Sequence, residues 1–403
     1  MKDRLFDKLM FKKFDLFGIK FRIVDIIFML SIWVMAWIVR IKMIPIESAD
    51  YFGFLEEWMD TIRYYGGFKS LKYEISNYTS PYMYLMCLVS VITDDSLKGL
   101  KFVSYFFDYA ASIAVFIIVF HNTGSMKKSL VGMTMLLFSP AVILDGAYWC
   151  QCDIIYSCLI LYAFVFFYKK NSKMCMIMIG LAFSFKLQTL FVVPFLIIMW
   201  LKKDAIRIRD FIWIPVMYVV MNIPAYLFGR PLKDLMSVYF SQSGYYPWGT
   251  LKYPNMYYLL DETMECMHHS EEVCAAGVLV CIAILGVIAY YFYVSDVKMN
   301  SWQKMYLSLI LVATIVYVLP HMHDRYGFLA DIFALVLASM NRRKIHIFAF
   351  YSFITIFTYM PYLLGYEVFP LKYVAVFNGI LLVYMYYDFF CNYEKVRELS
   401  DGQ

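Results

Sequence analysis

The sequence predicts an all-α polytopic membrane protein. Of its 403 residues, 62% are hydrophobic and only 17% are charged, whereas a soluble domain is close to half apolar and a quarter charged. The apolar residues recur in long runs along the whole chain. Backbone polar groups must be satisfied within a bilayer, so these runs are expected to form helices. We expect one transmembrane domain spanning residues 1–403.

Ten apolar segments are clear candidates for membrane spans: 21–41, 102–120, 129–147, 154–168, 211–228, 273–294, 305–320, 327–340, 345–361 and 373–390. A helix needs about 20 residues to cross the hydrocarbon core, and several of these segments are shorter. We therefore expect a bundle in which some helices are short or largely buried. Together with a helical hairpin described next, the segments predict about 12 crossings.

Two regions are ambiguous, and the placement of basic residues decides between their readings. Residues 79–93 are too short for a simple span and suit a re-entrant or interfacial segment. Residues 174–200 are too long, carry Lys186 and Gln188 in their middle, and are flanked by basic clusters on both sides. If 79–93 does not cross and 174–200 is a hairpin of two short helices, most Lys and Arg residues fall on the cytoplasmic side, as the positive-inside rule requires.

This topology predicts a multi-pass protein of the cell (inner or plasma) membrane with both termini in the cytoplasm. The basic stretch before the first span indicates an anchored first helix rather than a cleaved signal. Two long outer segments follow, at 42–101 (including the re-entrant segment) and at 229–272. The net charge of +5 comes from short clusters between spans, which does not indicate nucleic-acid binding, and the nine cysteines show no CxxC pair.

Ionisable residues near membrane depth are costly and usually face a cavity. Asp50 follows the first span, and its carboxylate could act as a general base toward an incoming hydroxyl. The alternative is a helix cap, because Ser48 and Asp50 are both good N-cap residues. A second acid, Asp145, lies near the outer end of the span 129–147.

The stretch Trp149-Cys-Gln151-Cys-Asp153 closes the span 129–147 at its outer end. Trp149 could offer a stacking face to a sugar, while Gln151 and Asp153 could bind its hydroxyl groups. The alternative is a Trp of the aromatic belt followed by a helix-capping Asp.

Lys186 and Gln188 lie at the predicted tip of the hairpin. A buried Lys needs an anionic partner, which could be a bound phosphate or a carboxylate of the protein itself. Both readings stay open from the sequence.

Four polar residues, His321, His323, Asp324 and Arg325, follow the span 305–320. Arg325 is suited to binding a phosphate, and the neighbouring His and Asp side chains could orient it or contact an acceptor. The alternative is a plain interfacial polar turn. A divalent cation is conceivable, but the two His are spaced i, i+2, so they do not share a helical face. The sequence fixes no metal ligand and no cofactor.

These residues fall into five ordered blocks between about residues 50 and 326. The blocks are Asp50-Tyr51 with Trp58 and Gly66-Gly67; Asn77 to Tyr82 with Tyr84; Ser139-Pro140 with Trp149, Gln151 and Asp153; Phe185 to Gln188 with Pro194; and Pro320 to Tyr326. The chain thereby resembles the polyprenyl-phosphate-sugar-dependent glycosyltransferases of the GT-C fold, closest to bacterial relatives of the PIG-V-like GPI mannosyltransferases. It departs from their pattern at Cys150, where a smaller residue is usual, and at Asp324, where Glu is usual.

The resemblance implies a GT-C-like helical bundle with its active site on the outer face of the membrane. It implies a transferase that moves a hexose, mannose-like, from a polyprenyl-phosphate-linked donor to a glycan or lipid-linked acceptor such as a cell-envelope polysaccharide, with inversion. The family's catalytic Asp maps onto Asp50. Lys186 and Arg325, supported by His323, are then expected to bind the donor phosphate. The sugar and acceptor contacts are expected from Trp149, Gln151, Asp153, Gln188, His321 and Asp324.

Three other functions compete with this reading. A flippase or transporter for lipid-linked sugars would need a polar path through the bundle, and the spans carry few ionisable residues in their cytoplasmic halves. A glycan polymerase or ligase would use pyrophosphate-linked donors, often beside a basic outer loop, and 229–272 is not basic. A scaffold would not need polar residues gathered on one membrane face.

Overall fold

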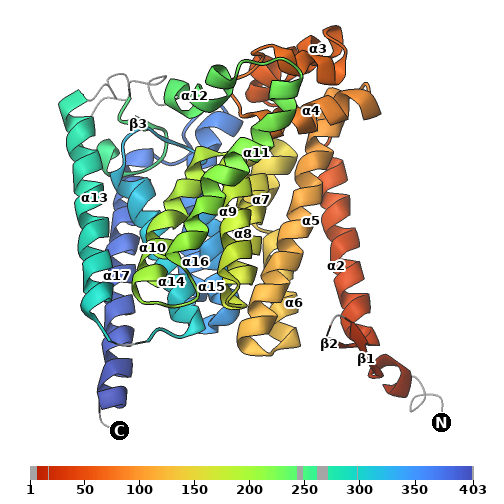
Figure 1. The fold of residues 1–403 in the computed structure, drawn as a ribbon. Coiled ribbons are helices and arrows are strands. Elements are labelled where there is room, and N and C mark those ends of the chain that lie inside the picture. Colours follow the sequence, from red (N-terminus) through yellow and green to blue (C-terminus); the bar gives the residue numbers. More distant parts are fainter. Residues whose placement is uncertain (1–6, 17, 243–247, 261–270, 297, 402–403) are drawn as a thin grey trace.

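The computed structural model describes residues 7–16, 18–242, 248–260, 271–296 and 298–401. The described chain is mostly helical, and the helices form a bundle with several short helices gathered at one end (Figure 1). Within the predicted outer segment 229–272, residues 243–247 and 261–270 lie outside the described residues.

Eight helical segments are long and apolar enough to cross a membrane: Ile23–Lys42, Ser96–Thr123, Met126–Tyr148, Ile208–Leu227, Glu271–Val294, Ser301–Val318, Arg342–Leu363 and Leu371–Cys391. Five apolar helices are shorter, at Ser80–Ile92, Asp153–Tyr168, Ser172–Phe185, Leu187–Leu201 and Phe328–Met340. A helix thus lies at each of the ten predicted spans, and the eight long apolar helices are compatible with the predicted all-α membrane protein.

The helices of the bundle are α2 (Ile23–Lys42), α5 (Ser96–Thr123), α6 (Met126–Leu137), α7 (Pro140–Val142), α8 (Asp153–Tyr168), α9 (Ser172–Phe185), α10 (Val193–Leu201), α11 (Trp213–Leu227), α13 (Glu271–Val294), α14 (Ser301–Val318), α15 (Phe328–Met340), α16 (Ile345–Leu363) and α17 (Leu371–Asp401). Short π-helical or 3₁₀ segments extend several of them: η3 (Ile143–Tyr148), η4 (Leu187–Val192), η5 (Ile208–Ile212) and η7 (Arg342–Lys344). At one end lie η1 (Tyr51–Leu55), α3 (Glu56–Tyr64), η2 (Gly67–Lys72), α4 (Ser80–Ile92), α12 (Leu232–Gln242) and η6 (Met256–Leu259).

Only four short strands occur in the described residues. β1 (Lys13–Leu16) and β2 (Ile19–Arg22) form an antiparallel hairpin before α2. β3 (Thr250–Leu251) and β4 (Met322–His323) form a two-residue parallel pair at the other end of the bundle. The second pair positions part of the site described below.

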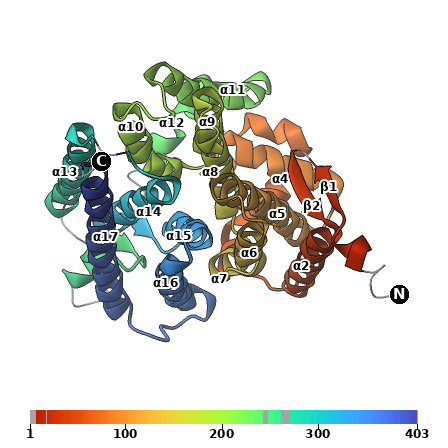
Figure 2. The same ribbon diagram turned by 90° about the horizontal axis from the view of Figure 1, so that it is seen from below.

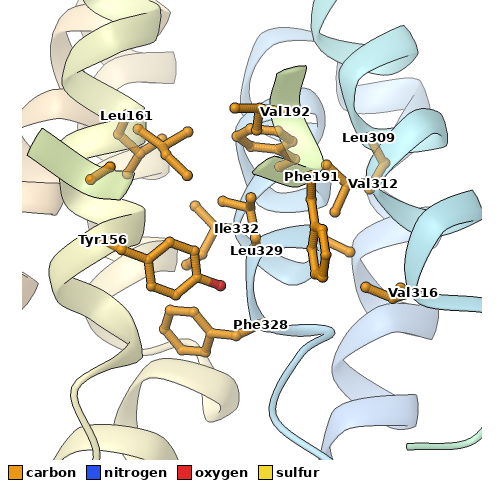
Figure 3. Close-up of a cluster of buried hydrophobic side chains, with 14 of the residues drawn as sticks. Tyr156, Leu161, Phe191, Val192, Leu309, Val312, Val316, Phe328, Leu329 and Ile332 are labelled. Carbon is orange, nitrogen blue, oxygen red and sulfur yellow. The ribbon is translucent and has the colours of Figure 1, made fainter. Parts of the chain in front are cut away.

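The centre of the bundle is α15, every residue of which is buried. Its apolar side chains pack against α8, η4 and α14, where Phe191, Val312 and Ile332 lie together (Figure 3). By contrast α2, α11 and α13 lie at the periphery (Figure 2). They expose apolar side chains, as expected of helices that face lipid. Close approach of helices depends on small residues: a Cβ at Gly180 of α9 would lie 2.7 Å from the carbonyl oxygen of Trp213 of α11.

The region 174–200 forms the predicted hairpin of two short helices. α9 ends at Phe185, Lys186 is extended, and η4 with α10 leads back. The start of α9 and the segment that follows α10 lie together, because the backbone N–H of Arg207 donates to Ser172 Oγ at 3.0 Å. Lys186 therefore lies at the opposite end of the bundle from Ser172 and Arg207.

Helix α4, within the ambiguous segment 79–93, has both of its ends at the same end of the bundle. At its start Thr79 donates to the carbonyl oxygen of Phe185 at the hairpin tip. At its end the carbonyl oxygen of Thr93 accepts from Arg63 of α3. This is the arrangement expected of a segment that does not cross.

The loops that carry the predicted cytoplasmic basic clusters gather at the other end. Hydrogen bonds connect these loops to one another in four places: His121 to Tyr168, Tyr168 to Ser301, Lys202 to Ser295, and Lys128 to Met340. The described chain also begins and ends there (Figure 1). We call this the basic end, and the end that carries α3, α4 and the hairpin tip the cavity end.

Candidate active site

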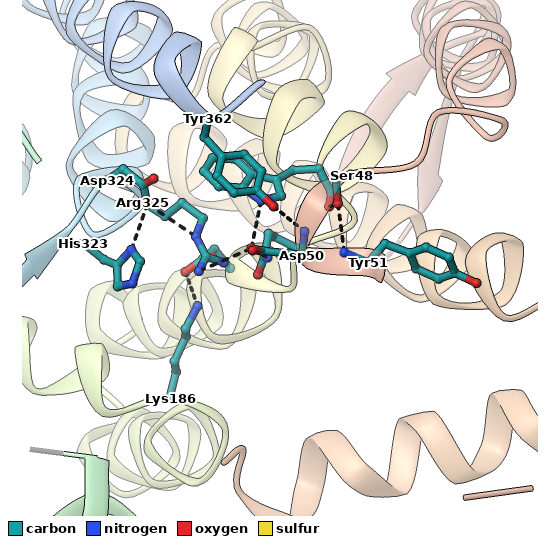
Figure 4. Close-up of polar contacts among 11 residues, drawn as sticks. Ser48, Asp50, Tyr51, Lys186, His323, Asp324, Arg325 and Tyr362 are labelled. Atoms are coloured by element: carbon teal, nitrogen blue, oxygen red, sulfur yellow. Dashed lines mark hydrogen bonds and ion pairs between the residues drawn. The ribbon is translucent and has the colours of Figure 1, made fainter. Parts of the chain in front are cut away.

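Asp50 immediately precedes η1 at the cavity end. Its side chain does not cap that helix. The cap is Ser48, whose Oγ accepts from the backbone N–H of Tyr51 at 3.2 Å and donates to the carbonyl oxygen of Trp149 at 2.6 Å (Figure 4). The capping alternative therefore applies to Ser48 and leaves the carboxylate of Asp50 for other contacts.

The carboxylate of Asp50 accepts two side-chain hydrogen bonds at the same oxygen. Trp149 Nε1 donates to Oδ2 at 2.9 Å, and Gln151 Nε2 donates to it at 2.5 Å. Arg325 Nη2 lies 4.0 Å from the same oxygen. The side chain of Asp50 is 21% exposed, so it is held by neighbours and still reaches open space.

A strained turn brings Trp149 and Gln151 to Asp50. The wide helix η3 ends with backbone hydrogen bonds from Trp149 to Leu144 and from Gln151 to Asp145, both at 2.9 Å. Between them Cys150 has a φ of 66°, in the left-handed region that a non-glycine residue rarely adopts. Such strain persists where the surrounding structure fixes it, which is common at functional sites.

Lys186 pairs with Asp153 across the site. Helix α9 ends one residue before Lys186, whose Nζ lies 2.5 Å from Asp153 Oδ1 at the start of α8. The Lys–Asp pair that the sequence left open is therefore present. The second oxygen of Asp153 lies 3.6 Å from Arg325 Nη1, so one buried carboxylate faces both cations.

Arg325 lies on the turn between β4 and α15. Pairing with β3 fixes this turn, since the backbone N–H of Asp324 donates to the carbonyl oxygen of Leu251 at 2.9 Å. Burial alone would lower the pKa of Arg325, but the neighbouring carboxylates of Asp153, Asp324 and Asp50 raise it well above its ordinary value. The guanidinium is therefore charged at neutral pH.

The guanidinium of Arg325 has carboxylates near it, yet its hydrogen-bonding capacity is not used. The three ion-pair distances to Asp50, Asp153 and Asp324 are 4.0, 3.6 and 3.7 Å. Its Nε and Nη1 are buried and have no hydrogen-bond acceptor among the described residues. Buried donors of this kind are costly unless a ligand or water satisfies them.

These groups border a cavity of about 380 Å³ at the cavity end. Eight of the ten predicted site residues line it: Asp50, Trp149, Gln151, Lys186, Gln188, His323, Asp324 and Arg325. Asp153 lies behind this lining and is fully buried. His321 is also outside the lining, and its Nδ1 lies 2.6 Å from the carbonyl oxygen of Trp248.

The remaining polar contacts involve His323 and Gln188. His323 Nδ1 lies 3.0 Å from Asp324 Oδ1, which also faces Arg325. The Oε1 atom of Gln188 is buried without a hydrogen-bond partner among the described residues. In the part of the chain that the structure describes, no three His, Cys, Asp or Glu side chains are grouped so that they could hold a metal ion.

Trp149 does not present a free face to the cavity. Its ring is 1% exposed and stacks on Tyr362 with a centroid distance of 4.0 Å and an interplanar angle of 16°. The guanidinium carbon of Arg325 lies 5.1 Å from the Trp149 ring centroid. Trp149 thus serves Asp50 as a hydrogen-bond donor, and the expected stacking of a sugar on its ring is not available in this arrangement.

Tyr362 is the main site residue that the sequence did not single out. It lines the cavity, and the backbone N–H of Asp50 donates to its hydroxyl (Figure 4). It follows Pro361 at the end of a span, where a Tyr is indistinguishable from an aromatic residue of the membrane interface. Only the fold brings it to Asp50.

A second hollow lies between α4 and α5. It is an apolar groove of about 560 Å³ lined by Leu85, Leu88, Val89, Ile92, Thr93, Lys98, Gly99, Phe102, Val103, Phe106 and Phe107. It shares no lining residue with the polar cavity, although Thr79, the residue before α4, lines that cavity. The groove fits hydrocarbon, and the cavity fits a polar group.

Taken together, the cavity can bind an anion at Arg325 and Lys186 while Asp50 accepts a proton nearby. In comparisons with known proteins, no family model and no curated protein matches this chain. Its function must therefore be inferred from the site itself.

Proposed function

We propose that the protein is a membrane glycosyltransferase of the GT-C type. It transfers a hexose from a polyprenyl-phosphate donor to a glycan or lipid-linked acceptor, and the mannose-like identity of the hexose comes from the family resemblance alone. The observation that carries this proposal is the buried guanidinium of Arg325, whose Nε and Nη1 lack acceptors, beside Lys186 and Asp50 on one cavity.

The charges of the site favour a phosphate that binds the cations in addition to the carboxylates already beside them. Asp153 and Asp324 already neutralise much of the charge of Lys186 and Arg325. These carboxylates stand 3.6–4.0 Å from the guanidinium, too far to accept its hydrogen bonds. A phosphate oxygen at hydrogen-bonding distance would satisfy donors that the protein leaves open.

The same cations would lower the barrier of the reaction. As the bond between the sugar anomeric carbon and the phosphate oxygen breaks, its electron pair goes to that oxygen, and a phosphodiester monoanion becomes a phosphate monoester dianion. Lys186 and Arg325, with His323 beside them, would stabilise the added charge, which is the kind of interaction that accelerates chemistry. The leaving oxygen then needs no general acid.

Asp50 would take the proton of the acceptor hydroxyl as its oxygen bonds to the anomeric carbon. Direct displacement of this kind inverts the anomeric centre. The hydrogen bonds from Trp149 and Gln151 fix the carboxylate for this role. Gln188 and Asp324 would contact the sugar and the acceptor, whereas His321 lies outside the lining.

The membrane arrangement follows from the two ends of the bundle. We infer about 12 crossings, with the basic end in the cytoplasm, as the positive-inside rule favours. The cavity end then faces outward from the cell membrane. The hydrocarbon tail of a lipid-linked substrate would lie in an apolar groove, for which the hollow between α4 and α5 is suited.

The proposal is tested with purified protein, a polyprenyl-phosphate hexose and candidate glycan acceptors. We expect a transferred sugar in wild-type protein and about 10³-fold slower transfer in Asp50→Asn protein that folds normally. Movement of the intact donor across vesicle membranes without a transfer product would instead support a flippase. Turnover only with a pyrophosphate-linked donor would support a polymerase or ligase.

A further inference from the structure

We propose that Tyr362 positions Asp50 for transfer, acting on both its backbone and its carboxylate. The inference rests on the proposed function, in which Asp50 is the base. It concerns a residue more than 300 positions away in sequence, supplied by the last turn of α16 (Ile345–Leu363).

Asp50, Tyr362 and Trp149 each contact the other two. The backbone N–H of Asp50 donates to the hydroxyl of Tyr362. The ring of Tyr362 stacks on Trp149, and Trp149 Nε1 donates to Asp50 Oδ2 (Figure 4). One tyrosine therefore holds Asp50 directly at the backbone and indirectly at the reacting carboxylate.

Asp50 needs such support because of where it lies. The first N–H groups of a helix have no intrahelical acceptor, and Asp50 is at the start of η1. Its own side chain does not cap the helix, so the orientation of the carboxylate depends on groups from other segments. A displacement of about 1 Å in a reacting group can lower turnover about 10²-fold.

A neighbouring tyrosine shows what a purely structural contact looks like. Tyr359, one turn earlier on α16, meets Trp149 edge-on with a centroid distance of 5.2 Å. Its hydroxyl is buried without a hydrogen-bond partner among the described residues, and it is not part of the cavity lining. Both tyrosines touch Trp149, but only Tyr362 contacts Asp50 and borders the cavity.

This pair supplies a matched experiment. Tyr362→Phe keeps the ring and removes the hydroxyl, and Tyr359→Phe does the same at the control position. We expect Tyr362→Phe to lower kcat about tenfold without changing KM for the donor, because a positioning contact acts on the chemical step. Tyr359→Phe should leave both constants unchanged, and thermal unfolding of both variants checks that they fold.

A second readout does not depend on activity. Asp50 is modified with a water-soluble carbodiimide in detergent-solubilised protein without substrate, and the product is quantified by peptide mass spectrometry. Loss of the Tyr362 hydroxyl should raise the rate of modification about threefold or more, while Tyr359→Phe should match wild type.

The outcomes separate this inference from the proposed function. If wild-type protein transfers no sugar, the proposed function fails, and the labelling still decides whether Tyr362 holds Asp50. If Tyr362→Phe matches wild type in both turnover and labelling, the positioning role is overturned. A rise in donor KM with unchanged kcat would also overturn it, since Tyr362 would then be a donor contact.

Discussion

Two pairs of buried cations in this molecule have similar chemistry and different surroundings. Arg40 of α2 and Lys101 of α5 lie in the bundle, and Arg325 and Lys186 lie at the cavity. Each arginine faces an aspartate, Asp108 in the first case and Asp153 in the second. Burial and ion pairing alone do not distinguish the two pairs.

The difference lies in how many donors are used. Arg40 donates to Asp108 at 2.7 Å and to the carbonyl oxygens of Ala36 and Leu137. Lys101 donates to three carbonyl oxygens that follow the end of α2, a favourable place for a cation.

Arg325 has no hydrogen-bond acceptor for its Nε and Nη1 among the described residues. Arg40 Nη2 and Asp108 Oδ1 also lack hydrogen-bond partners among the described residues, but Arg40 is fully buried, whereas Arg325 lines the cavity and leaves room there for a ligand. Function in a membrane interior is therefore better indicated by open donors beside a cavity than by buried charge itself.

The largest effect on turnover should come from removing the proposed base, Asp50, at the cavity. Asp50→Asn keeps the size of the side chain and loses proton acceptance, so we expect kcat to fall about 10³-fold. Donor binding should change little, because the cations remain. Turnover at saturating donor and equilibrium donor binding measure the two effects, and retention of more than about a tenth of turnover in folded protein would remove Asp50 from the role.

Changes to the bundle pair Arg40–Asp108 should affect stability and leave the chemistry unchanged. Arg40→Met leaves Asp108 buried without its partner, which should cost about 3 kcal/mol of unfolding free energy. The double variant with Asp108→Leu should recover most of that loss. Unfolding in detergent measures both, and turnover per folded molecule should equal that of wild type; a selective loss of turnover would show that the two pairs are not different in kind.

In the pair at the cavity, Arg325→Lys keeps the charge and removes the planar set of hydrogen-bond donors. We expect the donor kcat/KM to fall about 10²-fold, since several charge-assisted hydrogen bonds to phosphate are lost. Unfolding temperature should stay close to that of wild type, in contrast to Arg40→Met. Donor use that survives this change, and survives Lys186→Ala as well, would disprove the phosphate assignment.

The smallest effect concerns the apolar groove between α4 and α5. Leu88→Trp would fill part of it, and we expect donor KM to rise about fivefold for a long polyprenyl chain, because less hydrocarbon surface can be buried. A short-chain donor should be used as by wild type. An equal change for both donors would place the tail elsewhere.

Much of the fold could be predicted because apolar length and basic flanks are local properties of the chain. The hairpin around Lys186 follows from a segment too long for one span between two basic clusters. The π-helical turn η3 and the left-handed backbone conformation of Cys150 could not be predicted in the same way. Their conformations are imposed by packing, and a Cys carries no signal for a positive φ.

The candidate site was predictable in its charged residues and less so in its aromatic ones. A charge at membrane depth is rare enough to stand out, which singled out Asp50, Lys186 and Arg325. Aromatic residues are abundant at every helix end, so Tyr362 carried no distinguishing signal. Trp149 was singled out by position, but which partner covers its ring depends on the approach of α16.

The most direct test is a structure of the protein with a bound polyprenyl-phosphate hexose or a non-hydrolysable analogue. We expect its phosphate within hydrogen-bonding distance of Arg325 and Lys186, and the anomeric carbon facing the side of the cavity where Asp50 lies. A phosphate bound elsewhere, with the open donors of Arg325 still unoccupied, would contradict the assignment of this cavity as the donor site.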